Sequence, residues 1–88
     1  MKIEQAFGIV LREYRKRAAL SQEELALNCE LDRTFISLLE RGQRRPTLNT
    51  IFAISKSLDI NPSQLVKEVE NILNDDKAHK SGDAPLTL

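Results

Sequence analysis

Residues that start or end helices recur at short intervals along this sequence. Ser21-Gln-Glu-Glu24 has the form of a capping box, in which the Ser hydroxyl and the Glu carboxylate each accept a backbone N–H at the helix start. Asp32 is a favourable N-cap, and Asn61 followed by Pro62 is a further helix start. Gly42 suits the left-handed position that follows a helix. Because these signals lie close together, they favour several short helices over long helices or strands.

The spacing of apolar residues agrees with these boundaries. Ile36 and Leu39 lie three residues apart and share one helical face. We predict an all-α fold, with a compact five-helix domain over residues 1–73 and a polar, disordered tail over residues 74–88. The helices are predicted at about residues 3–17, 22–29, between Asp32 and Gly42, 48–57 and 62–73. The inward-facing residues of the fourth helix are predicted to be Leu48, Ile51, Phe52, Ile54 and Leu58.

Positive charge is gathered in one place. The whole chain balances 13 Lys and Arg against 13 Asp and Glu, and a neutral composition alone argues against a nucleic-acid partner. The stretch DRTFISLLERGQRRP, residues 32–46, nevertheless holds four arginines against two acids. Such a local cluster beside a short helix can bind phosphates and read bases without making the whole surface basic.

Several classes of function find no support in the residues. One Cys and one His cannot form an internal disulfide or a zinc site of soft ligands. No nucleophile is paired with a base and no Gly-rich phosphate loop is present, so we predict no enzyme activity, cofactor, metal or small-molecule ligand. The longest apolar run near the start, Phe7–Leu11, is too short for a signal peptide or a membrane span. We therefore expect a cytoplasmic protein without a membrane partner.

The second and third predicted helices form a helix-turn-helix, because only residues 30–32 separate them. SQEELALNCELDRTFISLLERG followed by RRPTLNTIFAIS resembles the Cro/repressor-type helix-turn-helix family, often called XRE-type, over about residues 7–66. The segment LDRTFIS is further similar to controller proteins of restriction–modification systems. The matched positions are Gln22, Leu25, Ala26, Ile36, Ser37, Glu40, Gly42, Pro46, Leu48 and Ile51.

The resemblance implies a bacterial or phage transcription regulator that binds double-stranded operator DNA as a homodimer, with its third helix in the major groove. It implies a nucleoid-associated location, and a contact with RNA polymerase is compatible with it, although no residue is assigned to that contact. It also implies an ion pair between Arg15 and Glu40. A carboxylate among Ile36 and Leu39 would be costly to bury without a cationic partner.

The sequence departs from the family where Gly often follows a helix. Those places hold Ala19, Glu30 and Asp59, and a left-handed residue other than Gly costs about 1 kcal/mol. None of the three lies on the predicted DNA-binding surface, so the departures concern local stability.

Residues of the third helix opposite Ile36 and Leu39 are predicted to face DNA. An Arg fork matches guanine O6 and N7, short hydroxyls allow close approach, and an apolar side chain can touch a thymine methyl. Loop cations and helix N-termini suit phosphates. We predict base contacts from Arg33, Thr34, Ser37, Leu38 and Arg44, and phosphate contacts from Gln22, Arg41, Gln43, Arg45, Thr47 and Asn49. The alternatives are that Arg33 only contacts phosphate, that Leu38 packs in a seam, and that the loop cations are merely solvated.

The apolar stripe of the fifth helix is longer than one capping helix needs. We predict a dimer interface formed by Val66, Val69, Ile72 and Leu73; the alternative is that these residues fold back onto Ile3 and Phe7. A second functional hypothesis is an antitoxin or antirepressor of the same fold whose main partner is a protein. A steep loss of DNA affinity with rising salt would favour the DNA-binding hypothesis.

Overall fold

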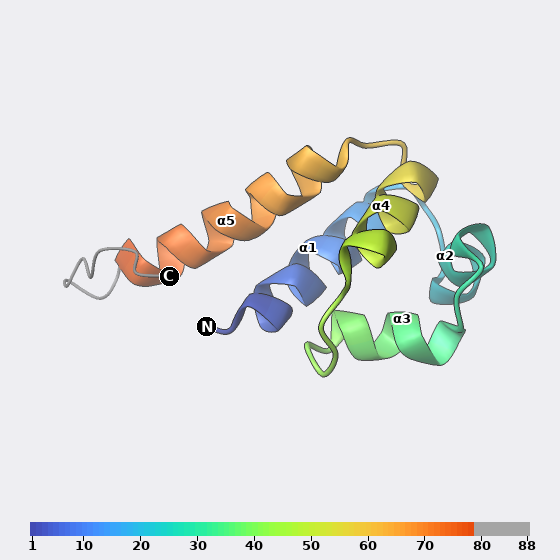
Figure 1. Ribbon diagram of the computed structural model, residues 1–88, viewed down its shortest axis with the longest axis horizontal. Helices are drawn as coiled ribbons and strands as arrows, with labels where there is room; N and C mark the ends of the chain where they lie inside the picture. The colour runs from blue at the N-terminus through green and yellow to red at the C-terminus, as the bar shows by residue number, and fades with distance from the viewer. Residues whose placement is uncertain (79–88) are drawn as a thin grey trace.

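Five helices make up the part of the chain that the structure describes, and the all-α prediction is confirmed. A computed structural model describes residues 1–78, and no strand occurs within them. The short helix α2 packs against both α3 and α4 at one end of the molecule, and α5 runs along α1 (Figure 1). The bounds are α1 Ile3–Arg17, α2 Gln22–Cys29, α3 Arg33–Glu40, α4 Leu48–Ser57 and α5 Pro62–Ala78.

The last helix is longer than predicted. We placed its end near Leu73 and a disordered tail from Asn74, whereas α5 continues to Ala78. The polar residues after Leu73 include no Gly or Pro before Ala78, so a change of composition was mistaken for the end of the helix. Asp76 Oδ2 lies 2.6 Å from the N-terminal ammonium group of Met1. The rest of the predicted tail, residues 79–88, lies outside the described residues.

The predicted helix starts are present, with one difference. The hydroxyl of Ser21 accepts the N–H of Glu24 at 3.0 Å, and Glu24 Oε1 accepts the N–H of Ser21 at 2.9 Å. Thr47 Oγ1 accepts the N–H of Thr50 at 3.1 Å. Asp32 occupies the N-cap of α3 with an extended backbone, but its side chain makes no capping hydrogen bond. The predicted N-cap position of Asp32 is therefore correct, but the side-chain hydrogen bond typical of an Asp N-cap is not formed.

The ends of the first four helices share one left-handed turn. The φ angles are 58° at Ala19, 56° at Glu30, 71° at Gly42 and 57° at Asp59. After α1, for example, the N–H of Leu20 binds the carbonyl of Arg15, which is the pattern of a Schellman motif. The three non-Gly residues therefore adopt the left-handed backbone for which the resemblance implies Gly.

The core forms around α1, which packs against both α3 and α5. At Gly8 the approach is so close that an added Cβ would lie 2.6 Å from the carbonyl oxygens of Leu39 and Glu40. The backbone of α1 therefore rests directly on the end of α3, and no larger residue fits there without a shift. The buried apolar residues are Ala6, Phe7, Val10, Leu11, Leu25, Ala26, Ile36, Leu39, Ile54, Leu58, Leu65 and Val69.

The apolar residues of α4 divide between two faces, which corrects the prediction for that helix. Ile54 and Leu58 are buried, and Ile51 packs against the core. Leu48 and Phe52 instead are 71% and 60% exposed. Within residues 1–78, no helix is both long enough and apolar enough to cross a membrane.

Candidate nucleic-acid interface

The α3 helix has one face in the core and one toward solvent. Ile36 and Leu39 are completely buried. Arg33 and Thr34 are exposed at the start of the helix, and Ser37 and Leu38 are half-buried farther along it. This helix lies along an edge of the molecule on the side away from α5 (Figure 1). The solvent-facing side of α3 is therefore accessible to an elongated partner.

The C-terminal end of α3 is fixed to α1 by the ion pair that the resemblance implied. Arg15 Nε lies 2.5 Å from Glu40 Oε2, and Arg15 Nη2 donates to Glu40 Oε1 at 3.0 Å. The Glu40 side chain is only 4% exposed, and its hydrogen bond raises the pKa of Arg15. Arg15 Nη1 also donates to the carbonyl of Leu20 at 2.9 Å. The pair thereby ties α1, the turn after it and α3 together.

Gln22 has a structural contact in addition to the phosphate contact predicted for it. Its Nε2 donates to Glu40 Oε1 at 3.0 Å. A primary amide carries two hydrogens, so one donor stays available at the first turn of α2. Arg15, Ser21, Gln22, Glu23 and Arg33 line a depression of about 480 Å³. A phosphate in this depression would meet the start of α2 together with Arg33.

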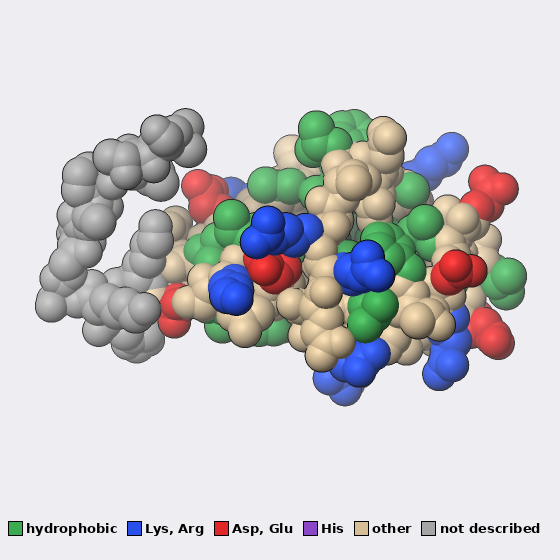
Figure 2. Space-filling model, turned by 60° about the horizontal axis from the view of Figure 1, so that its bottom comes forward, with side chains coloured by type: hydrophobic (Ala, Val, Ile, Leu, Met, Phe, Trp, Pro, Cys, Tyr) green, Lys and Arg blue, Asp and Glu red, His purple; other side chains and the backbone are tan. Residues whose placement is uncertain are grey.

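The loop between α3 and α4, which follows the C-terminal end of α3, carries the other predicted contacts. Arg41 donates through Nε to the carbonyl of Ser37 at 3.4 Å. Arg45 forms an ion pair with Glu4 of α1. Figure 2 shows separate basic side chains spread over the face of the molecule to which α3 belongs. The remaining loop and α4 residues assigned to DNA, which are Gln43, Arg44, Thr47 and Asn49, are all exposed.

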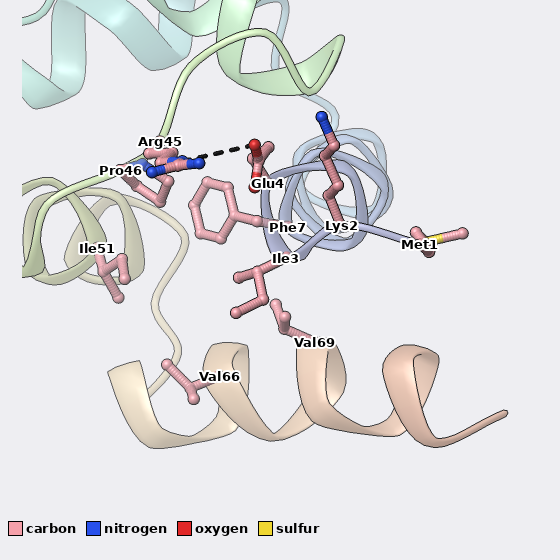
Figure 3. A pocket seen from close by; sticks show the side chains of 10 residues that line it. All are labelled: Met1, Lys2, Ile3, Glu4, Phe7, Arg45, Pro46, Ile51, Val66 and Val69. Carbon is pink, nitrogen blue, oxygen red and sulfur yellow. Dashed lines mark hydrogen bonds and ion pairs between the residues drawn. The ribbon is translucent and has the colours of Figure 1, made fainter. Parts of the chain in front are cut away.

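The residues predicted for a dimer interface are only partly available. Val69 is 7% exposed and belongs to the core, while Ile72 and Leu73 pack against that core. Val69 lines an apolar groove of about 690 Å³ together with Ile3 and Phe7 (Figure 3), so the alternative in which α5 folds back onto α1 describes this residue. Val66 alone among the four is largely exposed, at 48%.

The sequence reasoning missed two features of this surface. Leu48 and Phe52 are four residues apart and form a second apolar stripe on α4, which a helical projection would have separated from Ile54 and Leu58. Glu4 gave no local signal, because its partner Arg45 lies 41 residues away in the chain.

No cluster of three or more His, Cys, Asp or Glu side chains suited to a metal occurs within residues 1–78. Cys29 is half-buried, and its Sγ lies 3.2 Å from Ser57 Oγ and 3.7 Å from the carbonyl oxygen of Ala53. Burial raises the pKa of this thiol. Cys29 therefore has the surroundings of a packing residue.

Comparison with known proteins identifies the same architecture. A helix-turn-helix family model matches residues 11–65, which is more than half of the chain. Control protein C.BamHI of Bacillus amyloliquefaciens is 44% identical over 61 residues, which covers 68% of this chain and 75% of that protein. The restriction–modification controller protein C.AhdI of Aeromonas hydrophila superimposes with a TM-score of 0.69 at 44% identity, over 70% of this chain and 94% of that chain.

A more distant structure supports the fold alone. The clp gene regulator ClgR of Corynebacterium glutamicum superimposes with a TM-score of 0.84 at 20% identity, over 91% of this chain and 85% of that chain. The chain belongs to the XRE-type helix-turn-helix family of DNA-binding transcription regulators, which is not a family of enzymes.

Proposed function

We propose that the protein binds a two-fold symmetric operator as a homodimer, with α3 of each subunit in the major groove. The observation that carries this proposal is the division of α3, whose buried residues Ile36 and Leu39 leave Arg33, Thr34 and Ser37 on the accessible side. Arg33 would bind guanine through its two-pronged guanidinium group, and the two hydroxyls would approach neighbouring bases. Leu38 and Arg44 are proposed to complete the base contacts.

Phosphate contacts are proposed on both sides of α3. On one side, the free amide hydrogen of Gln22 and the start of α2 would bind one backbone phosphate. On the other side, the α3–α4 loop and the first turn of α4 would bind a second. These contacts fix the register of the helix on the duplex without reading its sequence. The proposed groups of the second site are Arg41, Gln43, Arg45, Thr47 and Asn49.

The dimer surface is proposed on α4 and the adjoining part of α5. Leu48 and Phe52 are apolar side chains mostly exposed to water, and Val66 adds an exposed residue on the helix that packs against α4. Burying such side chains against a second copy would stabilise the dimer by roughly 25 cal/mol for each Å² removed from water. Two-fold symmetry would then place the α3 helices about 34 Å apart, or a multiple of this distance, along the duplex.

The dimer is tested by sedimentation of Phe52→Ala over a range of concentrations. The variant should dissociate at higher concentration than the native chain, because an apolar contact is lost. Leu27→Ala is the matched control, since Leu27 is 73% exposed on α2, outside the proposed surface. Equal dissociation of the two variants would place the interface elsewhere.

DNA recognition is tested by selection from a pool of random duplexes, performed with the native chain and with Arg33→Ala. The native chain should recover a two-fold symmetric motif, and the variant should lose preference at one guanine of each half-site. Recovery of no motif, with only weak and salt-sensitive binding, would favour the antitoxin or antirepressor hypothesis. Contact with RNA polymerase and association with the nucleoid stay predictions, because both depend on further partners.

A further inference from the structure

The first turn of α1 lies directly against the loop that carries the arginines. A Cβ added at Gly42 would lie 3.0 Å from Gln5 Cα, so the loop and this turn touch. Gln5 Oε1 in turn accepts the backbone N–H of Lys2 at 2.9 Å, which caps the helix. Side chains at the start of α1 therefore have fixed positions beside the loop.

Glu4 uses this position to face Arg45. Glu4 Oε2 lies 3.5 Å from Arg45 Nε, and Figure 3 shows the two side chains side by side at the edge of the apolar groove. The Glu4 side chain is 16% exposed, whereas Arg45 is 83% exposed. A hydrogen bond with its own backbone, and then the charge of Arg45, hold the pKa of Glu4 below its usual range. The carboxylate is therefore ionised at neutral pH.

The two partners differ in their freedom to move. Glu4 is fixed on a helix, while Arg45 extends from a loop into solvent and is held by one long contact. Such a contact positions a guanidinium weakly, because exposed ion pairs contribute little energy. Its charge nevertheless offsets that of Arg45, and a carboxylate repels phosphate at the distances found in such an interface.

We propose that Glu4 is an intramolecular competitor of DNA phosphate for Arg45, and that it lowers the affinity of the protein for DNA of any sequence. This inference rests on the proposed function, in which Arg45 binds phosphate. When DNA binds, Arg45 exchanges the carboxylate of Glu4 for a phosphate, so part of the binding energy is spent on the exchange. Because the exchange takes place at the sugar–phosphate backbone, it weakens operator and random DNA by the same factor.

The test is the affinity of the full chain for a selected operator duplex and for a random duplex, with Glu4→Gln compared to the native protein. The variant should bind both duplexes roughly three- to tenfold more tightly at low salt, since one exposed ion pair per subunit no longer competes. The ratio of the two affinities should not change. The dependence on salt should steepen by up to about 0.9 per subunit, because a free Arg45 releases a further counterion.

Two controls separate competition from a general change of charge. Glu13→Gln removes the same charge from an exposed site on α1, where Glu13 pairs only loosely with Arg17 at 3.7 Å, and its effect should be much smaller. In an Arg45→Ala background, Glu4→Gln should lose most of its effect and gain no more than Glu13→Gln does. If the full gain persists in that background, or if Glu4→Gln weakens binding, the competition is refuted.

The outcome also separates this inference from the function on which it rests. If Arg45→Ala leaves DNA affinity unchanged, the phosphate role of Arg45 fails and the inference fails with it. If Arg45→Ala weakens binding while Glu4→Gln changes nothing, the inference alone fails. Glu4→Asp shortens the reach toward Arg45 while keeping an acid at the start of α1. It replaces Glu4→Gln if that variant melts below the assay temperature, and the same direction of change is expected.

Discussion

Removal of Arg15 should destabilise the protein more than the loss of an ordinary salt bridge. In the native chain, Glu40 accepts two hydrogen bonds from Arg15 and one from Gln22, and its side chain is 4% exposed. In Arg15→Ala, the carboxylate keeps only the neutral amide and stays out of water. Leaving one member of a buried pair uncompensated costs about 3–5 kcal/mol.

That loss is a large part of what a domain of this size has. At roughly 0.05–0.15 kcal/mol for each residue, the whole chain is stable by about 4–13 kcal/mol. A loss of 3 kcal/mol should lower the melting temperature by at least about 12 °C. The assay is urea and thermal unfolding followed by circular dichroism, at one protein concentration because a dimer would link stability to concentration.

The matched control is an exposed ion pair. Lys67 lies 3.3 Å from Glu70, and both side chains are more than half exposed. Lys67→Ala should cost less than about 0.5 kcal/mol. If Arg15→Ala lowers the free energy of unfolding by no more than this control, the Arg15–Glu40 pair does not behave as a buried ion pair. Replacing both members, as in Arg15→Met with Glu40→Leu, should recover much of the loss, because no unpaired charge then remains.

Three further outcomes follow from the geometry. Gly8→Ala should lower the free energy of unfolding by more than about 1 kcal/mol despite the better helix propensity of Ala, because the new methyl group meets two carbonyl oxygens at 2.6 Å. Substitution of the exposed Ile9 by Ala is the control, and a Gly8→Ala variant more stable than the native chain would refute the close packing at Gly8. Glu30→Gly should raise the melting temperature by several degrees, since its φ is 56°, with unchanged DNA binding; an unchanged or lower melting temperature would count against this reasoning. The pH dependence of Cys29 alkylation by iodoacetamide should give a thiol pKa above that of free cysteine. Ser57→Ala should raise this pKa further, because the hydrogen bond from Ser57 lowers it. A Cys29 thiol that reacts like free cysteine would refute the effect of burial on its pKa.

Local signals explain why so much of the fold was predictable. The capping box at Ser21 and the turn at Gly42 depend on a few neighbouring residues, and the structure forms both. The outward face of α3 follows from the same logic, because the positions of Ile36 and Leu39 determine which side the other residues take. The helical pattern was thus enough to place Arg33 on the accessible side.

Contacts between distant segments explain the errors. Which of the apolar residues on α4 are buried depends on where α2 and α5 lie, so the exposure of Phe52 could not be read from composition. Two other contacts depend in the same way on the packing of α1 against the rest of the domain. They are the ion pair of Glu4 with Arg45 and the close approach of α3 to Gly8. The extension of α5 beyond Leu73 was missed for another reason, since polar residues are compatible with an exposed helix as well as with a tail.

The contact at Gly8 has a consequence for how such a regulator can change over time. The residues that hold α3 in place, which include Ile36, Leu39 and Glu40, are different from the residues that we propose to contact DNA. Substitution of Arg33 or Thr34 should therefore leave the packing of α3 against the core unchanged. Protein and operator can diverge together in single steps, each of which leaves a folded protein.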